Sequence, residues 1–273
     1  MSAEGARVQA VLGRVARDPA LRDRFAQAPE ATLGELGLDE GERAGMLRYG
    51  PSRLLAYHEM VHTRLLGTIR TFMGGAAERL GRDRLRAEVD AWIAEAGPKT
   101  RYLRDVPAEF LAWARPRWEA DASLPPWLPE LAAHQVLIRT IRNEPREIGA
   151  PTGVKLDLDR PIACNPTVRV LRYRWSVHRL PKQLGPEDAP AEDAPIVIGH
   201  RNRAQRSSFF ELEPRLAHML ELLLAGKTLR EALFGACEAV GETLDDAVLS
   251  DAALVLADLH DRHVLLGGVP AAQ

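Results

Sequence analysis

The sequence predicts an α+β fold that is predominantly α-helical, with an N-terminal helical bundle followed by a small winged-helix-like α/β domain. Two observations predict this class. Apolar residues recur at helical spacing through most of the first 145 residues, whereas the segment LRYRWSVH alternates strictly between apolar and polar residues. Helical spacing then returns from Leu212 onward, so a short set of strands lies between two helical regions.

Short helices are predicted near the N-terminus, and capping residues mark their boundaries. Four apolar residues share one face of the first helix: Val8, Val11, Leu12 and Val15. Asp18 followed by Pro19 is typical of an N-cap with proline in the first turn, and Pro29 begins another short helix. Asp39, with Glu42 three residues later, predicts a capping box for a fourth helix.

Longer helices follow in the predicted bundle, over residues 53–73, 83–96, 107–114 and 129–143. We expect Ser52 to cap the first of these helices and Asp83 to begin the second. The proline-rich segment SLPPWLP separates the last two helices.

The pattern changes in the C-terminal region. Residues 146–166 are rich in proline and have no helical period, which predicts a linker or a long crossing segment. In the strand that follows, the apolar side chains share one face: Leu171, Tyr173, Trp175 and Val177. The segments IVIGHRNR and SSFFEL predict two more strands, and an acidic, proline-rich loop joins the first strand to the second.

Three helices and a short strand complete the predicted C-terminal domain. The first helix ends at Gly226, Thr228 and Glu231 form a capping box for the second, and the third covers residues 245–262. The segment VLLGGV predicts the last strand. We expect an N-terminal helical segment, a helical bundle, a linker and a winged-helix-like domain, at residues 1–52, 53–145, 146–166 and 167–273.

Composition excludes several classes of protein. Of 273 residues, 46% are hydrophobic and 27% are charged, which is typical of a globular chain and not of a disordered one. The net charge of −2 argues against a chain that binds nucleic acid over its whole surface. Two cysteines cannot build a disulfide framework or a zinc site by themselves. Since neither an export signal nor a long apolar stretch is present, we expect a cytoplasmic protein that does not bind a membrane.

The string HEMVH has the H-E-x-x-H spacing of zinc peptidases. On a helix, His58 and His62 share one face and can bind one zinc ion, while Glu59 serves as the general base. A third ligand is also needed, and the extended form of the motif fails because Leu65 and Thr68 replace its glycine and its third histidine. We therefore expect no metal site and keep a zinc metallopeptidase as an alternative.

Basic side chains follow the predicted strands. Six of them are expected to form one peptide-binding face: Arg172, Arg174, His178, Arg201, Arg203 and Arg206. Arginine binds carboxylates and phosphates through its planar guanidinium group, so such a face suits an acidic peptide or a nucleic-acid backbone. The alternative is a solvated sheet face, partly neutralised by the acidic loop at 187–193. We expect no catalytic residues, because no nucleophile motif, P-loop or dinucleotide fingerprint is present.

A series of short motifs runs through most of residues 53–265. In order they are RLLAYH from Arg53, LLG from Leu65, YL from Tyr102, PAEFL from Pro107, LPPWLPELA from Leu124, and the segments Leu171–Val177 and Leu216–Leu233. This order resembles the helical partner proteins, often labelled DNA-binding-domain proteins, that are encoded beside multinuclear non-haem iron oxidative enzymes. The methanobactin-type biosynthesis partner subunits are among them.

The chain departs from this family in three places. Phe72-Met73 stands where the family usually has F-P, His134-Gln135-Val136 stands where L-E-W is common, and His58 replaces an arginine. Residues 17–48 also resemble a short helical module of ring-opening dioxygenase small subunits.

The resemblance implies a non-catalytic bacterial subunit for the biosynthesis of ribosomally made, modified peptides (RiPPs). It implies a heterodimer with an iron-dependent oxidative enzyme, which would hold the iron, and no cofactor in this chain. The C-terminal domain would be a peptide-recognition domain in which an edge strand pairs with the leader of a precursor peptide and arginines select its acidic side chains. A DNA-binding regulator stays open as a further alternative, although nucleic acid is not the partner we expect.

Overall fold

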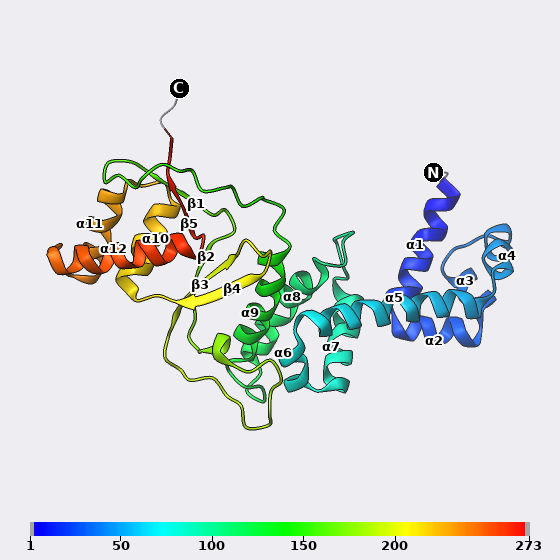
Figure 1. Ribbon diagram of the computed structural model, residues 1–273. Coiled ribbons are helices and arrows are strands. Elements are labelled where there is room, and N and C mark those ends of the chain that lie inside the picture. Colours follow the sequence, from blue (N-terminus) through cyan, green and yellow to red (C-terminus); the bar gives the residue numbers. More distant parts are fainter. Residues whose placement is uncertain (1–2, 271–273) are drawn as a thin grey trace. The chain divides into compact units, whose positions relative to one another are not determined.

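A computed structural model describes residues 3–270 of the chain, and within them all side chains except those of residues 3–6, 16, 17, 19, 54, 57 and 58. The chain forms two compact units, Met1–Ala132 and Ala133–Gln273. The first unit is helical, and the second combines helices with two small antiparallel sheets (Figure 1). The predicted α+β, predominantly helical class is therefore confirmed.

The first unit is built from α1 (Ala3–Arg17), α2 (Pro19–Gln27), α3 (Pro29–Glu35), α4 (Glu40–Arg48), α5 (Pro51–Phe72), α6 (Gly74–Leu80), α7 (Arg82–Glu95) and α8 (Val106–Ala120). Two predicted N-caps are confirmed. The carboxylate of Asp18 accepts a hydrogen bond from the backbone N–H of Leu21 at 3.0 Å, and Asp39 and Glu42 form the expected capping box at the start of α4.

Glycine sets two helix boundaries that the sequence analysis placed wrongly. α5 begins at Pro51, immediately after Gly50 (φ 85°). Ser52 therefore lies inside the first turn and does not cap the helix. α7 begins directly behind Gly81 (φ 79°), so Asp83 is its second residue. Glycine adopts positive φ without the steric penalty of a Cβ, and this conformation ends the preceding segment. α8 is longer than predicted because it continues through Pro116.

Two apolar groups stabilise the first unit. The helices α1–α4 enclose one core: Val11, Val15, Leu21, Phe25, Leu33, Leu38 and Met46. In the other, Phe110 of α8 is fully buried and packs edge-to-face against Trp92 of α7 and Trp118, with ring centroids 5.7 and 6.0 Å apart.

The second unit contains the end of α9 (Leu128–Arg142), then β1 (Ile162–Cys164), β2 (Arg169–Arg172), a 3₁₀ turn η1 (Val177–Arg179), β3 (Ile196–Arg201), β4 (Ser207–Glu211), α10 (Pro214–Leu224), α11 (Leu229–Val240), α12 (Asp246–Asp261) and β5 (Leu265–Gly268). β1 pairs with β5, and β3 lies between β2 and β4 in the three-stranded sheet. The predicted capping box of Thr228 and Glu231 begins α11, and Gly241 (φ 72°) ends it.

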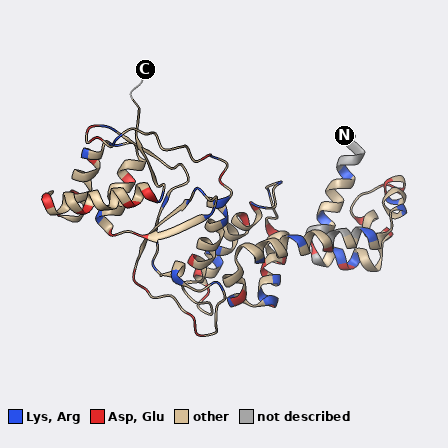
Figure 2. Ribbon diagram, in the orientation of Figure 1, with Lys and Arg blue, Asp and Glu red and all other residues tan. Residues whose placement is uncertain are grey.

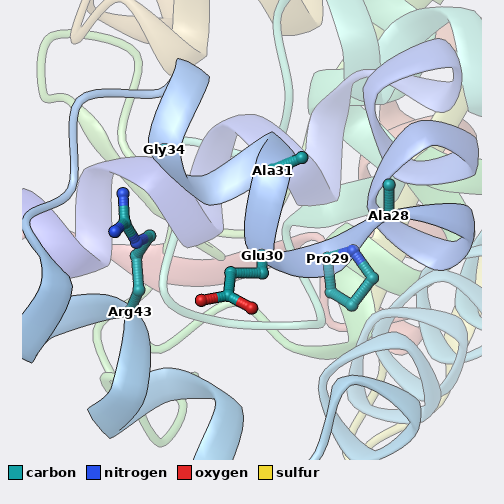
Figure 3. Close-up of a pocket in the computed structure, with 6 residues that line it drawn as sticks. All are labelled: Ala28, Pro29, Glu30, Ala31, Gly34 and Arg43. Carbon is teal, nitrogen blue, oxygen red and sulfur yellow. The ribbon is translucent and has the colours of Figure 1, made fainter.

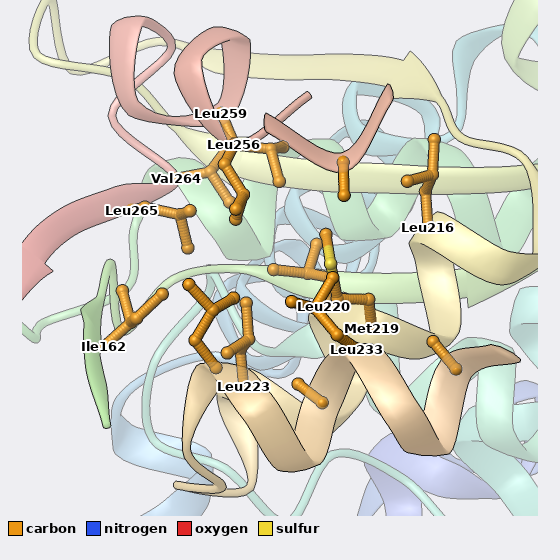
Figure 4. Close-up of a cluster of buried hydrophobic side chains, with 14 of the residues drawn as sticks. Ile162, Leu216, Met219, Leu220, Leu223, Leu233, Leu256, Leu259, Val264 and Leu265 are labelled. Carbon is orange, nitrogen blue, oxygen red and sulfur yellow. The ribbon is translucent and has the colours of Figure 1, made fainter. Parts of the chain in front are cut away.

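The three-stranded sheet lies between two helical layers (Figure 1). On one face, Ile198 of β3 joins the apolar core of α10–α12. Figure 4 shows part of this core, with Leu220 and Leu223 of α10 near Leu256 and Leu259 of α12. On the other face lies α9, which approaches β3 closely at Gly199. A Cβ at Gly199 would lie 2.7 Å from the Phe209 ring and 2.9 Å from Ile141, so packing against α9 requires glycine there.

The segment predicted as a linker lies against β5. The backbone N–H of Thr152 donates to the carbonyl of Leu266 at 2.8 Å, and that of Gly268 donates to the carbonyl of Val154 at 2.9 Å. The end of the segment forms β1 itself. Residues 146–166 therefore cross the second unit and take part in its packing.

Candidate functional site

The predicted basic face is interrupted, because the strand that should carry it is short. β2 ends at Arg172, and the chain turns into η1 at Val177. Arg172 lies on the sheet face that packs against α10, whereas His178 lies beside His134 of α9. The structure therefore does not bring the six predicted peptide-binding residues together on one face.

Two of these arginines have carboxylate partners within the unit. Arg172 binds Glu221 of α10 through two hydrogen bonds of 2.8 and 2.9 Å, and Arg174 binds Glu192 of the acidic loop at 2.6 Å. These pairs are exposed, so each stabilises the fold only weakly. An acidic ligand would have to replace the carboxylate that each arginine already holds.

Arg201 lies elsewhere than predicted: it is buried, with 7% of its surface exposed. Its guanidinium donates to the carbonyl of Glu144 at 2.5 Å and also to the carbonyl of Arg146. Its backbone N–H donates to the hydroxyl of Thr167 at 2.9 Å. Arg201 thus holds the segment that follows α9 against β3, and the expectation that it lies on an exposed ribbon is wrong.

Arg203 and Arg206 lie where a ligand can reach them. Both are exposed in the turn between β3 and β4. Within the part of the chain that the structure describes, neither guanidinium has an acidic partner. Of the predicted set, these two arginines are the cations that can accept an external carboxylate without breaking an internal ion pair.

The outer edge of β4 presents unpaired backbone groups beside these arginines. The Leu212 N–H donates to the Ile196 carbonyl at 3.0 Å and the Asn202 N–H to the Arg206 carbonyl at 2.9 Å, which fixes the alternation of the ladder. By this alternation, the N–H and C=O groups of the odd-numbered residues point away from β3: Ser207, Phe209 and Glu211. They have no hydrogen-bond partner among residues 3–270. Such an edge can pair with another strand.

The comparison with known families matches this part of the chain. Residues 165–260 match the HvfC C-terminal domain. This domain occurs in HvfC-type partner proteins of RiPP-modifying oxidative enzymes, in agreement with the resemblance found in the sequence. None of the curated proteins compared with the chain matches it. The match spans β2, β3 and β4, and it therefore includes the exposed arginines and the open edge.

A partly buried cluster of histidines and aromatic rings lies at the other end of β4, and the sequence analysis did not find it. The Nδ1 atom of His134 lies 2.8 Å from the hydroxyl of Tyr173, and the His134 ring packs edge-to-face on Phe209 at 4.8 Å. His178 stacks on Tyr173 and binds Glu211 at 2.7 Å. Burial, together with the charge of His178, lowers the pKa of His134 to about 4, so His134 is neutral at neutral pH.

This cluster fixes the end of β4, which lies in the segment that matches the HvfC C-terminal domain. Arg179 binds both oxygens of the Glu211 carboxylate, at 2.5 and 2.6 Å, and also binds Asp193 at 2.8 Å. Hydrogen bonds from Arg179 lower the pKa of Glu211. Since these charges satisfy one another, the cluster positions the strand, and the free cations lie at its opposite end.

The zinc-peptidase string lies on α5, in the first unit. His62 is buried there and pairs with Asp90 of α7, and Glu59 pairs with Arg86 of α7 at 3.3 Å. The side chain of His58 lies outside the described residues. Among the residues that are described, no three His, Cys, Asp or Glu side chains are grouped so as to hold a metal ion. His62 and Glu59 therefore serve to hold α5 against α7.

A shallow hollow lies between α3 and α4 in the first unit (Figure 3). Glu30 and Arg43 both line it, and Arg43 lies close to Gly34, where a Cβ would come 3.0 Å from the guanidinium. Because one acidic and one basic side chain line the hollow, it favours neither an anionic nor a cationic ligand. It is a feature of helix packing.

Charges of both signs are interspersed along the elements (Figure 2), and they nearly cancel, to a net charge of −2. No helix within residues 3–270 is long and apolar enough to span a membrane. The candidate site consists of the open edge of β4 and the two exposed arginines beside it, Arg203 and Arg206.

Proposed function

We propose that this chain is a non-catalytic partner subunit that forms a heterodimer with a multinuclear non-haem iron oxidative enzyme and presents a ribosomally made precursor peptide to it. The match of residues 165–260 to the HvfC C-terminal domain carries the proposal. The iron belongs to the enzyme, and this chain supplies affinity for the peptide and sets its register.

The open edge of β4 offers a mode of binding. A peptide leader that adds as a fourth strand would pair with the free backbone groups of Ser207, Phe209 and Glu211. Acidic residues of the leader would then lie near Arg203 and Arg206, whose guanidinium groups form charge-assisted hydrogen bonds with carboxylates. The pairing supplies affinity, and the arginines supply the preference for an acidic leader.

Binding to DNA has less support. α12 carries several acidic residues, among them Asp246, Asp251 and Asp258, and α11 carries Glu231 and Glu238. Phosphate groups are repelled by such helices, and a strongly bound duplex needs several cationic contacts. The charge of this domain therefore favours a peptide over a nucleic acid.

Co-expression with a multinuclear non-haem iron oxidative enzyme from the same organism tests the proposed assembly. The expected result is a complex of one subunit of each that survives gel filtration, with all of the iron in the enzyme. The proposal would be overturned if the chain elutes alone. If it also carries one zinc ion per chain that His62→Ala removes, the peptidase alternative is correct.

Charge reversal tests the peptide site. In the purified complex, Arg203→Glu with Arg206→Glu is expected to weaken binding of the fluorescently labelled precursor by about tenfold or more, which corresponds to about 1.4 kcal/mol. Arg48→Glu with Arg53→Glu makes the same change in charge on the first unit and is expected to leave the affinity unchanged. Equal losses in the two variants would show that only net charge matters.

A further inference from the structure

A cavity of about 690 Å³ opens between α5, α6 and α7 in the first unit, outside the segment that matches the HvfC C-terminal domain. Each helix contributes residues at spacings of three and four, so one face of each lines the cavity. On α5 these residues are Thr63, Leu66, Gly67 and Arg70. The cavity is thus a groove with helical walls.

Cations dominate the groove. Arg70, Arg82 and Arg86 line it, against the single carboxylate of Glu78. Arg86 forms an exposed ion pair with Glu59 at 3.3 Å. Neither Arg70 nor Arg82 has an acidic partner in the part of the chain that the structure describes. The groove therefore carries positive charge that the fold itself does not neutralise.

Gly67 leaves the floor of the groove open. It lies inside α5, where glycine destabilises a helix by about 1 kcal/mol relative to alanine. A Cβ at Gly67 would meet nothing within 4 Å. Gly199 is different, because its neighbours leave no room for a Cβ. Packing within the first unit thus does not require glycine at 67, and its absent side chain gives a ligand access to the helix backbone.

The lining continues along α5 beyond the cavity. Met60 is 58% exposed and lies on the same face as Thr63 and Gly67, one turn earlier. From Met60 to Arg70 the helix rises about 15 Å at 1.5 Å per residue, which is close to three turns of a second helix. A surface of this length, apolar along its floor and basic at its edge, suits a helix better than a small molecule.

We propose that this groove binds an acidic amphipathic helix of a partner protein. Small apolar residues of the incoming helix pack over Gly67 and beside Leu66, and its carboxylates pair with Arg70 and Arg82. The inference does not depend on the proposed peptide presentation, because it uses a different unit and different residues.

Two synthetic helical peptides test this inference on the full chain. Both carry the same alanine and leucine stripe, flanked by glutamates in one and by lysines in the other. We expect the glutamate peptide to bind, as measured by fluorescence anisotropy, and the lysine peptide not to bind. Absence of binding by the glutamate peptide, or equal binding of the two, overturns the proposal.

Variants locate the binding. Gly67→Leu fills the groove and is expected to weaken binding of the glutamate peptide at least tenfold, whereas Gly13→Leu, at another helical glycine with open space around it, is expected to leave it unchanged. Arg70→Glu with Arg82→Glu is expected to abolish this binding and to allow the lysine peptide to bind. The charge-reversed pair decides the question even if Gly67→Leu does not fold. If the glutamate peptide binds the charge-reversed variant as tightly as the unmodified chain, its site lies elsewhere and the proposal is wrong.

Discussion

Both units have an apolar core, but the second also has a buried polar network that joins distant parts of the chain. In the first, apolar helix faces pack together, and the caps at Asp18 and Asp39 are formed by residues within one helical turn. In the second, polar groups connect distant parts of the chain. The amide of Asn165 donates to the carbonyls of Arg201 and His263, which are 36 and 98 residues away. Local pattern is therefore informative for the first unit and much less so for the second.

This difference predicts where each unit is most sensitive to substitution. An apolar core loses stability when a large side chain is removed, because a cavity is left behind. A buried polar network loses stability when one member is removed, because its partners stay buried without hydrogen bonds.

The largest effect is expected in the aromatic core of the first unit. Phe110→Ala removes a fully buried ring between Trp92 and Trp118 and is expected to lower the free energy of unfolding by about 3–5 kcal/mol. Hydrogen exchange should show lost protection in α7 and α8 and unchanged protection in β3. Tyr102→Ala, at a ring that is 56% exposed, is expected to have little effect. Equal loss of protection in both units would show that they unfold together.

The polar network of the second unit gives the next largest effect. Asn165→Ala removes four hydrogen bonds, two donated to carbonyls and two accepted from the backbone and hydroxyl of Thr167. A loss of about 3 kcal/mol is expected, since buried partners are left unsatisfied. Exchange should rise in β3 and not in α8. Asn143→Ala, at an exposed position after α9, is the control, and an effect as large as that of Asn165→Ala would contradict the interpretation.

The same contrast explains what the sequence could predict. Helix spacing and caps depend on neighbours in sequence, so most helices and the boxes at Asp39 and Thr228 were predicted correctly. The strand at β2 was predicted too long, because alternation continues past Arg172 while the chain already turns into η1. Arg201 was placed on the surface because its acceptors, backbone carbonyls more than 50 residues away, leave no mark in the local pattern.

The candidate site follows the same rule. Arg203 and Arg206 were expected on or just after a strand, as cations of one basic face, and the structure places both in the exposed turn between β3 and β4. The cluster around His134 was missed, because His134, Tyr173 and Phe209 are far apart in sequence. Only their three-dimensional proximity shows that these residues hold the end of β4.

Acid is expected to destabilise the second unit through His134. Its pKa is about 4 in the folded chain and about 6.5 when unfolded, so the unfolded state binds more protons between these values. Stability is therefore full above pH 6.5 and falls as the pH drops toward 4, by about 2–3 kcal/mol. Burial also lowers the pKa of His200, which adds to the fall.

Unfolding curves of His134→Gln between pH 7 and 4 check this prediction. Glutamine does not titrate, so the variant is expected to lose less stability over this range than the unmodified chain does. His260→Gln replaces an exposed histidine and is expected to keep the full decline. An unchanged slope in His134→Gln would assign the acid sensitivity to other groups.

Helix caps give the smallest effect, and the same effect in both units. Asp18→Ala removes the acceptor for the Leu21 N–H, and Thr228→Ala removes the acceptor for the Glu231 N–H. Each is expected to lower the free energy of unfolding by about 1 kcal/mol, because a cap acts within its own first turn whatever surrounds the helix. Ser52→Ala is expected to change stability by less than about 0.5 kcal/mol, since Ser52 caps nothing. A much larger loss at Thr228 than at Asp18 would show that caps in the second unit also support its long-range network.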